Sequence, residues 1–453
     1  MLPVTEKILN DDRGLLRNIQ VIHINHEIDD IFEFNNLLKK DGAELFFIAI
    51  PYKKKPNIKL QYPNATFSRD RNLNYVPLIC GKRHTRLKDK DLVPSILNVF
   101  VHVLEKFINP QKKLIVIQDG GYIALSHKAY QLKNFLGCVE QTESGATMFE
   151  KEFKTHKHKF PVITIARSPI KVQYESHFIT QRVFEETNLL FYEINEFLKF
   201  KKIIIGGYGQ IGRRLALLFR QTGTQVLIYD TNKKLQSLVE IDGLKYIQKI
   251  KSDHINESFC YIGCVGQRSF RFPELVQFLK SKKDVLYLVS ASSKRIEFLD
   301  IIGFFEMGKR RNSDESIKIR QELDHITNIM PIKNSIGVSY HFNYKNLPKR
   351  IILLAEGAPV NFYRQSSNSV PSKAIDPIQA LMMKSTLALI KTQNKIKNEI
   401  MFVGDPLVNK LLGIDEEKIM QDWAKLNGVT IFASDILTQF DTHPYYSKPS
   451  IKK

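Results

Sequence analysis

The segment that decides the fold is KKIIIGGYGQIGRRLALLFRQTGTQVLIYDTN, residues 201–232. It begins with an apolar run at 203–205, which is typical of a buried strand. The apolar spacing of a helix follows, and a second apolar run occupies 226–229. A strand, a turn, a helix and a second strand within about 30 residues predict a parallel βαβ unit of the Rossmann type.

Three glycines, Gly207, Gly209 and Gly212, separate the first strand from the helix. In this pattern the first glycine makes a tight turn, the second lets the backbone approach a pyrophosphate, and the third lets the helix pack on the strand. Gln210 and Ile211 open the helix, whose free N–H groups and dipole attract phosphate. We therefore expect a phosphate-binding turn at this point.

Asp230 ends the second strand, about 20 residues after the glycines. A carboxylate at this position accepts hydrogen bonds from the hydroxyls of an adenosine ribose. It also repels the additional phosphate of NADP, so the pattern predicts NAD as the cofactor. The alternative is a Rossmann-like fold whose dinucleotide site is empty.

The chain before this segment has the pattern of another parallel α/β domain. Apolar runs at 19–24 and 44–50 flank a helical pattern at 27–40. Further strands are expected at 114–118 and 162–166. Helices are expected at 180–200 and 376–397, on either side of the second α/β domain.

Composition excludes several classes of protein. The 453 residues, of which 43% are apolar and 25% charged, suggest two or three globular domains. Four cysteines are too few for a disulfide framework, and we expect reduced thiols and no metal site. No stretch reaches the ~18 apolar residues of a membrane helix, and acidic residues near the N-terminus argue against a signal peptide. We expect a cytoplasmic protein that does not enter membranes.

The formal charge of +20 raises the question of nucleic-acid binding. Basic residues cluster around 53–55, 82–90, 151–159 and 309–311. These clusters are dispersed along the chain, and none alternates with aromatic residues as in a platform for single strands. The pattern therefore argues against a specific nucleic-acid partner.

Four further segments, in order along the chain, resemble S-adenosylhomocysteine hydrolases. They are QDGGYIAL (118–125), GCVEQTESGATMFEK (137–151), FPVITIARSPIKVQYES (160–176) and KRIILLAEGAPVNFYRQSSNS (349–369). The resemblance implies bound NAD that oxidises the ribose 3′-hydroxyl of a nucleoside, elimination of a thiol, addition of water and return of the hydride. It also implies a homo-oligomer.

The resemblance assigns catalytic roles to four residues. Asp119 falls at an aspartate that contacts the sugar and takes part in acid–base chemistry. Lys171 matches a lysine that bonds the hydroxyl to be oxidised. His26 matches an N-terminal histidine, and Glu175 stands where the family has an aspartate.

Other positions correspond to binding residues of the family. Asn361 matches an asparagine that holds the nicotinamide amide. Asp30 matches a carboxylate that reads the adenine amino group. The remaining positions expected to bind substrate are Glu140, Gln141 and Asn368.

The chain also departs from the family pattern. Gln141 is an amide where the family has a second glutamate that grips ribose hydroxyls. Asn368 and the run 290–293 replace two histidines, and the C-terminal tail has no clear counterpart. A catalytically inactive NAD-binding protein with a regulatory or scaffolding role is therefore the alternative. A 2-hydroxyacid dehydrogenase is weaker, because no arginine clamp or Glu–His pair is visible.

The fold that we expect consists of two Rossmann-like α/β domains with parallel sheets, an NAD-binding domain being inserted into a discontinuous substrate domain. The expected boundaries are 1–182 for the first part of the substrate domain, 183–363 for the NAD-binding domain, 364–410 for the return segment and 411–453 for a basic C-terminal extension.

Overall fold

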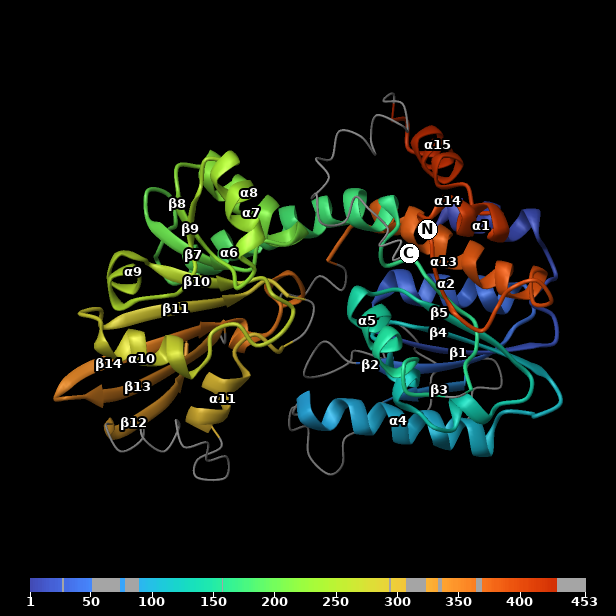
Figure 1. Ribbon diagram of the computed structural model, residues 1–453, viewed down its shortest axis with the longest axis horizontal. Helices are drawn as coiled ribbons and strands as arrows, with labels where there is room; N and C mark the ends of the chain where they lie inside the picture. The colour runs from blue at the N-terminus through green and yellow to red at the C-terminus, as the bar shows by residue number, and fades with distance from the viewer. Residues whose placement is uncertain are drawn as a thin grey trace. The chain divides into compact units, whose positions relative to one another are not determined.

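The computed structural model describes residues 1–26, 28–50, 74–77, 89–156, 158–292, 295–306, 323–332, 336–363 and 369–429. These residues form two compact units (Figure 1). Unit 1 is built from the described parts of Met1–Glu175 and Val370–Lys453, and unit 2 from those of Ser176–Ser369. The expected discontinuous first domain, with a second domain inserted into it, is therefore confirmed.

In the described part of unit 1, seven strands form one parallel sheet in the order β15-β6-β5-β4-β1-β2-β3. Long apolar runs form its central strands because both faces of the sheet are covered by helices. The strands are β1 (Ile19–His26), β2 (Glu44–Ile50), β3 (Asn74–Pro77), β4 (Lys113–Gln118), β5 (Phe135–Glu140), β6 (Val162–Thr164) and β15 (Ile400–Phe402).

Helices pack against both faces of this sheet. α2 and α13 lie together on one face, and α4 covers the other (Figure 1). The return segment of the chain therefore completes unit 1 with one long helix and one edge strand. The helices of unit 1 are α1 (Pro3–Asp11), α2 (Asp29–Lys40), α4 (Asp89–Lys106), α5 (Glu143–Glu152), α13 (Ser372–Lys391), α14 (Pro406–Leu412) and α15 (Glu416–Leu426).

The sheet of unit 2 has the order β12-β13-β14-β11-β10-β7-β8-β9. The six strands from β14 to β9 run parallel, whereas β13 and β12 extend the sheet in antiparallel pairs that the sequence did not reveal to us. The strands are β7 (Lys202–Gly206), β8 (Gln225–Tyr229), β9 (Lys245–Ile247), β10 (Cys260–Gly263), β11 (Val285–Ser290), β12 (Leu323–Pro331), β13 (Gly337–Tyr344) and β14 (Leu347–Leu354).

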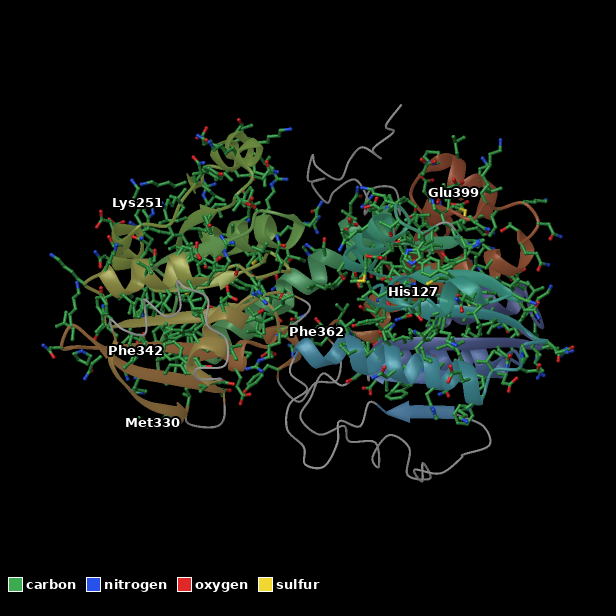
Figure 2. All side chains as sticks on the ribbon, turned by 60° about the horizontal axis from the view of Figure 1, so that its bottom comes forward. His127, Lys251, Met330, Phe342, Phe362 and Glu399 are labelled. Atoms are coloured by element: carbon green, nitrogen blue, oxygen red, sulfur yellow. The ribbon has the colours of Figure 1, made fainter. Side chains whose placement is uncertain are left out.

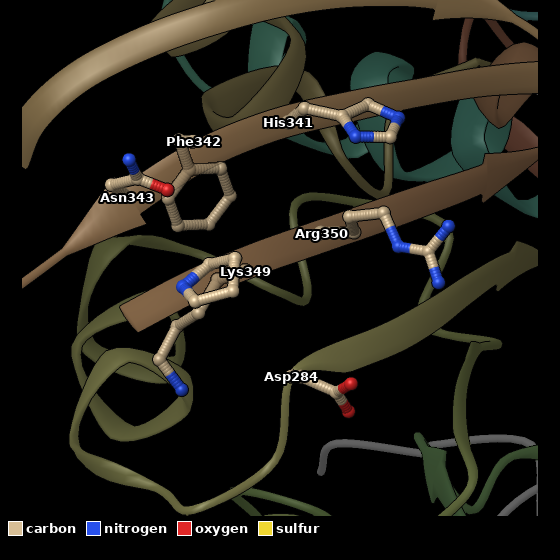
Figure 3. Close-up of a pocket in the computed structure, with 7 residues that line it drawn as sticks. Asp284, His341, Phe342, Asn343, Lys349 and Arg350 are labelled. Atoms are coloured by element: carbon tan, nitrogen blue, oxygen red, sulfur yellow. The ribbon is translucent and has the colours of Figure 1, made fainter. Parts of the chain in front are cut away.

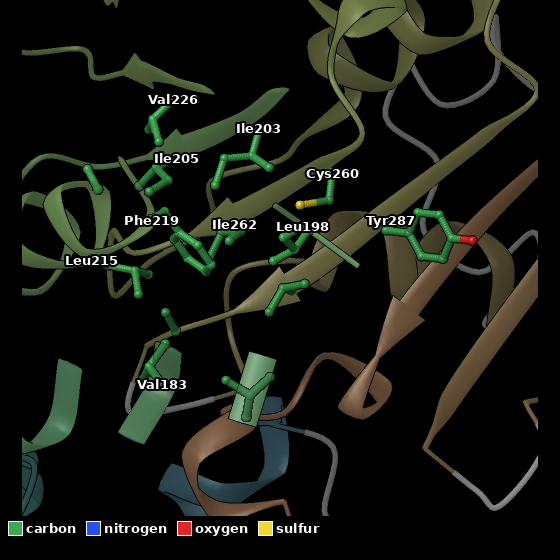
Figure 4. Close-up of a cluster of buried hydrophobic side chains, with 14 of the residues drawn as sticks. Val183, Leu198, Ile203, Ile205, Leu215, Phe219, Val226, Cys260, Ile262 and Tyr287 are labelled. Carbon is green, nitrogen blue, oxygen red and sulfur yellow. The ribbon is translucent and has the colours of Figure 1, made fainter. Parts of the chain in front are cut away.

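One apolar core lies on each face of the unit 2 sheet. Figure 4 shows the first, where Val183, Leu215 and Phe219 from two helices pack on strand residues such as Ile203 and Ile205. This packing holds the end of β7 in place. The helices of unit 2 are α6 (Ser176–Glu193), α7 (Gln210–Gln221), α8 (Gln236–Ile241), α9 (Ser252–Glu257), α10 (Phe272–Lys280) and α11 (Leu299–Glu306).

Two helix predictions have wrong ends. The helix expected at 180–200 is α6, which begins at Ser176 and ends at Glu193. Asn195 then adopts a left-handed conformation with φ 60°, which asparagine tolerates and which breaks the helix. The helix expected at 376–397 is α13, which is displaced toward the N-terminus by several residues.

Charged side chains such as Lys251 and Glu399 are exposed on the outside of their units (Figure 2). No helix within the described ranges combines the length and the apolar character needed to cross a membrane.

Candidate active site

In unit 2, the order of the strands reverses between β7 and β10, and the glycine turn follows β7. Ligands of doubly wound sheets bind at such a switch point, beyond the carboxyl ends of the strands. The turn therefore occupies the position expected of a dinucleotide site.

Each glycine of the turn has its own structural reason. Gly207 has φ +97°, a left-handed conformation that favours glycine. A Cβ on Gly212 would lie 2.0 Å from the carbonyl oxygen of Gly207, so only glycine lets the helix pack this closely. A Cβ on Gly209 would meet no atom of the described residues within 4 Å. The space beside Gly209 is open, as a pyrophosphate requires.

The helix that follows the turn begins without a side-chain cap. Gly209 is the N-cap of α7, and as a glycine it offers no side chain to accept a hydrogen bond from the first turn. Gln210 and Ile211 are the first helical residues, as expected for groups that offer their backbone N–H to phosphate.

Asp230 closes the turn from the end of β8. Its Oδ2 accepts a hydrogen bond from Tyr208 N at 2.8 Å, and its Oδ1 accepts one from Asn232 N at 2.8 Å. The side chain is partly exposed. Because each carboxylate oxygen has two lone pairs, both oxygens can accept a further bond from a ribose hydroxyl.

Beneath the turn lies a set of buried polar contacts that sequence patterns did not indicate. Tyr208 Oη donates to Asp242 Oδ2 at 2.6 Å. Arg213 donates to the same carboxylate through Nε at 2.6 Å and Nη2 at 2.9 Å. Burial and the neighbouring Asp242 raise the pKa of the Tyr208 hydroxyl. These contacts fix the glycine turn to the first turn of α7.

Asn361 lies after β14 and is 4% exposed. Its Nδ2 donates to Ser369 Oγ at 2.6 Å, which leaves Oδ1 as the group available to a ligand. Oδ1 is buried and has no hydrogen-bond partner among the described residues. An orphaned acceptor of this kind is costly unless a donor, such as a carboxamide N–H, binds to it.

The loop after β10 is held by Glu297, which sequence reasoning missed. The Glu297 Oε1 accepts hydrogen bonds from the backbone N–H groups of Val265 and Gly266, both at 2.7 Å. Burial raises the pKa of Glu297 to about 7. At the end of β11, buried Ser290 and Ser292 place their hydroxyls 3.4 Å apart, where the resemblance called for a histidine.

In unit 1, the strand order reverses between β1 and β4. His26 is the last residue of β1 and is buried, and Asp119 directly follows β4 and is partly exposed. Glu140 and Gln141 lie at the end of β5, the next strand. Four of the predicted site residues therefore share the carboxyl edge of one sheet, at its switch point.

Glu140 is fully buried and is used to hold the turn that follows Asp119. It accepts hydrogen bonds from Gly120 N (3.1 Å) and Gly121 N (2.9 Å), and from both the N–H and the hydroxyl of Thr142 (2.8 and 2.7 Å). Burial, with a contribution from Asp119, raises the pKa of Glu140 to about 7. Because its oxygens already accept these hydrogen bonds, Glu140 holds the turn that follows Asp119 in place.

Lys171 and Glu175 form an ion pair in a π-helical turn, Ile170–Glu175, that continues into α6. The Lys171 Nζ lies 2.8 Å from Oε1 and 2.6 Å from Oε2 of Glu175. Their side chains are 16% and 7% exposed. π-Helical turns are rare and occur frequently at functional sites.

Asp30 lies in the first turn of α2 and is also buried. Gln379 of α13 donates from Nε2 to Asp30 Oδ2 at 2.7 Å. Burial raises the pKa of Asp30 to about 6, and Glu175 is among the charges that act on it. Asp30 therefore belongs to the same region of unit 1 as the Lys171–Glu175 pair. The expected substrate residue Asn368 lies outside the described residues.

Unit 2 also has an open hollow of about 250 Å³ at the other edge of its sheet (Figure 3). It is lined by Asp284, His341 and Arg350 among others. Asp284 precedes β11 and Arg350 lies early in β14, so the hollow is at the amino ends of the parallel strands. Because dinucleotides bind at the carboxyl ends, the hollow is separate from the glycine turn.

No family model matches the chain. Solved structures similar to it include the dipicolinate synthase A chain of Bacillus subtilis (11% identity, 84% of this chain and 99% of that chain, TM-score 0.38). Another is a 2-hydroxyacid dehydrogenase of Ketogulonicigenium vulgare (8% identity, 82% and 95%, TM-score 0.39).

Curated proteins similar in sequence include the adenosylhomocysteinases of Sulfolobus acidocaldarius and Sulfurisphaera tokodaii. The first is 23% identical over 67% of this chain and 68% of its own length, and the second is 24% identical over 68% of each. An S-inosyl-L-homocysteine hydrolase of Methanocaldococcus jannaschii is 26% identical over 32% of this chain and 35% of its own length. At 22–24% identity over about two thirds of their length, the adenosylhomocysteinases are distant relatives of the chain, and these matches support the resemblance seen in the sequence.

Proposed function

We propose that unit 2 binds NAD and that the protein transiently oxidises a ribose hydroxyl of a nucleoside, so that a thioether such as S-adenosylhomocysteine or an analogue is cleaved. The observation that carries this proposal is the buried Oδ1 of Asn361, which has no hydrogen-bond partner among the residues that the structure describes. It lies in the unit whose glycine turn has open space beside Gly209. An orphaned amide oxygen suits the carboxamide of a nicotinamide, and the open turn suits a pyrophosphate.

The residues of unit 2 fit NAD in type as well as in position. The backbone N–H groups of Gln210 and Ile211 would hold the pyrophosphate at the start of α7. Asp230 would accept the hydroxyls of the adenosine ribose, and Asn361 would hold the carboxamide. NAD bound in this way would supply a hydride acceptor for a secondary alcohol.

The residues of unit 1 would bind the substrate and manage its protons. Lys171 would donate a hydrogen bond to the hydroxyl that is oxidised, and Glu175 holds the lysine Nζ in place. Asp119 is partly exposed beside a supported turn, so its carboxylate is available to exchange a proton with solvent or substrate. His26, at the switch point itself, is the second candidate for this role.

Asp30 would recognise the purine base of the nucleoside by a hydrogen bond. Burial raises the pKa of the Asp30 carboxyl, and the group acts as a pure hydrogen-bond acceptor when it is ionised. A carboxylate accepts a hydrogen bond from the 6-amino group of adenine, whereas hypoxanthine has a carbonyl oxygen there. This favours an adenosyl substrate over the inosyl substrate named for the Methanocaldococcus relative.

The test is to denature the purified protein and measure the NAD and NADH that it releases. Native protein is then incubated with S-adenosylhomocysteine or with adenosine, and NADH absorbance and free thiol are followed. We expect bound NAD, NADH formation with adenosine and thiol release that Lys171→Ala abolishes. Lys133→Ala, an exposed lysine of unit 1, is the matched control. Absence of NAD and of any NADH signal would refute the proposal.

A catalytically silent NAD-binding protein is the second candidate. It is favoured by the hydroxyls of Ser290 and Ser292, which cannot replace an imidazole in proton transfer near neutral pH. In that case the protein releases NAD on denaturation but forms neither NADH nor thiol with either compound. We also propose a homo-oligomer, which light scattering of the purified protein tests directly.

A further inference from the structure

A row of four buried polar side chains crosses unit 1 just below the switch point. His23 and Asn25 project from the same face of β1, because alternate residues of a strand share a face. His23 Nδ1 lies 2.6 Å from Oδ1 of Asn35, which α2 contributes. Asn25 Nδ2 lies 3.2 Å from His23 Nε2 and 3.1 Å from Gln141 Oε1. The row therefore runs Asn35–His23–Asn25–Gln141.

The direction of every hydrogen bond in this row follows from one backbone group. His26 N–H lies 2.7 Å from the Asn25 side chain and can only donate, so the Asn25 atom facing it is Oδ1. The Asn25 NH₂ group then faces both His23 Nε2 and Gln141 Oε1. His23 Nε2 must accept, so the proton of the imidazole lies on Nδ1 and is donated to Asn35 Oδ1.

The same reasoning determines the orientation of the Gln141 side-chain amide at the end of the row. Gln141 Oε1 is occupied by the Asn25 donor, so Gln141 Nε2 is directed away from the row. Nε2 donates to no atom within the described ranges, and it belongs to the residue that ends the row at the carboxyl edge of β5. A charged imidazole would place two donors face to face, and burial lowers the pKa of His23 to about 4. The row therefore keeps this polarity at neutral pH.

We propose that Gln141 is a specificity-determining donor whose N–H groups select a nucleoside by an oxygen that accepts a hydrogen bond, and that Asn25 and His23 are the positioning residues that hold it in this orientation. The inference rests on the proposed function, because it takes the ligand of this edge to be a nucleoside. A glutamate carboxylate at this position can only accept a hydrogen bond, so it requires a donor on the ligand. Gln141 requires only an acceptor, so an ether oxygen serves as well as a hydroxyl.

The ligand test compares adenosine with its 2′-O-methyl and 3′-O-methyl ethers by calorimetry, in wild type and in Gln141→Glu. The ether keeps the acceptor and loses the donor, and the size of the methyl group is the same for both proteins. For one of the two ethers, we expect the affinity ratio of ether to adenosine to be about tenfold higher in wild type than in the variant. Equal ratios for both ethers would overturn the inference while leaving the proposed function intact. Failure of wild type to bind any of the three ligands would overturn both.

The positioning test needs no ligand. Nitrogen-15 NMR of the wild-type histidines should show His23 neutral at pH 7 with its proton on Nδ1. Asn25→Asp removes the central donor, so the His23 proton should move to Nε2, Gln141 should turn over, and the preference for the ether should be lost. A cationic His23, or one protonated on Nε2, in the wild type would refute the relay. Asn25→Leu, which deletes the contact without adding a charge, should also weaken the preference for the ether and leave the NAD content of unit 2 unchanged.

Discussion

Gly209→Ala should abolish most cofactor binding while leaving the stability of the protein almost unchanged. Gly209 has φ −75° and ψ −166°, which alanine adopts without strain, and its Cβ would meet no atom within 4 Å. Alanine is the poorer N-cap by somewhat under 1 kcal/mol, but it restricts the unfolded chain by about 0.4–1 kcal/mol, so the two effects offset each other. The new methyl group would occupy the space proposed for the pyrophosphate. Overpacking of about 1–3 kcal/mol corresponds to a loss of NAD affinity of about 5- to 150-fold.

Gly212→Ala is the informative contrast. Its Cβ would lie 2.0 Å from a backbone oxygen of Gly207, where real Cβ contacts do not fall below 3.0 Å, so the turn and α7 must separate. We expect a destabilisation of about 1–3 kcal/mol or more in addition to loss of NAD. Gly303→Ala, with open space around it inside α11, should raise stability by about 0.5–1 kcal/mol and leave NAD binding unchanged.

The assay pairs calorimetric titration of NAD with thermal unfolding followed by circular dichroism. A change of 1 kcal/mol shifts the Tm of a domain of about 150–250 residues by about 2–4 °C, so Gly209→Ala should stay within that range of wild type. Wild-type affinity for NAD in Gly209→Ala, with the Tm also unchanged, would refute the assignment of the turn as the phosphate site.

Three further predictions concern single side chains. Lys171→Ala leaves the buried Glu175 carboxylate without its cation, so the free energy of unfolding in urea should fall by about 3–5 kcal/mol. The double variant Lys171→Met with Glu175→Gln should recover most of this free energy. Equal losses in the single and the double variant would contradict a buried ion pair. Asn361→Ala should lower NAD affinity roughly 3- to 10-fold in a titration, with little change in Tm because an unsatisfied oxygen is removed along with one hydrogen bond. The folded-state pKa of Glu297, about 7, lies above its ordinary value of 4.5, so the folded protein binds more protons than the unfolded chain between these pH values. The free energy of unfolding should therefore fall as pH rises through this window, by at most about 1.4 kcal/mol per pH unit. A pH slope that is unaltered in Glu297→Gln would exclude this residue as its source.

Local patterns predicted the parts of the site that are built from consecutive residues. Gly207 has a backbone reason and Gly212 a steric reason to be glycine, whereas Gly209 has open space beside it, and the spacing of the three glycines indicated all three roles. The end of β4 was also predictable, because the strand expected at 114–118 stops directly before Asp119. The apolar run of β1 stops at Ile24, two residues before the strand ends at His26, and His26 was singled out by the resemblance alone. The strand pairing that brings these two residues to one switch point follows from the ordinary order of doubly wound sheets.

Contacts between distant residues were not predictable in the same way. Gln379 binds Asp30 across 349 positions of the chain, and nothing in either segment marks the other as a partner. Asp242 binds Tyr208 and Arg213 for reasons of packing beneath the turn. The alternation of His23 and Asn25 within an apolar strand was a visible signal of a buried polar row, but its polarity depends on a backbone group that only coordinates reveal.

The interruption of unit 1 by unit 2 has a consequence for synthesis on the ribosome. Asp376 of α13 accepts hydrogen bonds from Val4 N, Thr5 N and the Thr5 hydroxyl, so the start of the chain is anchored by a helix made much later. β15 likewise pairs with β6 only after the whole insertion has emerged. Loop closure over so many residues is slow unless the intervening chain has already folded. We therefore expect unit 1 to remain incompletely folded during synthesis until unit 2 has folded. A mutation that slows the folding of unit 2 would leave the early strands of unit 1 exposed to aggregation for longer.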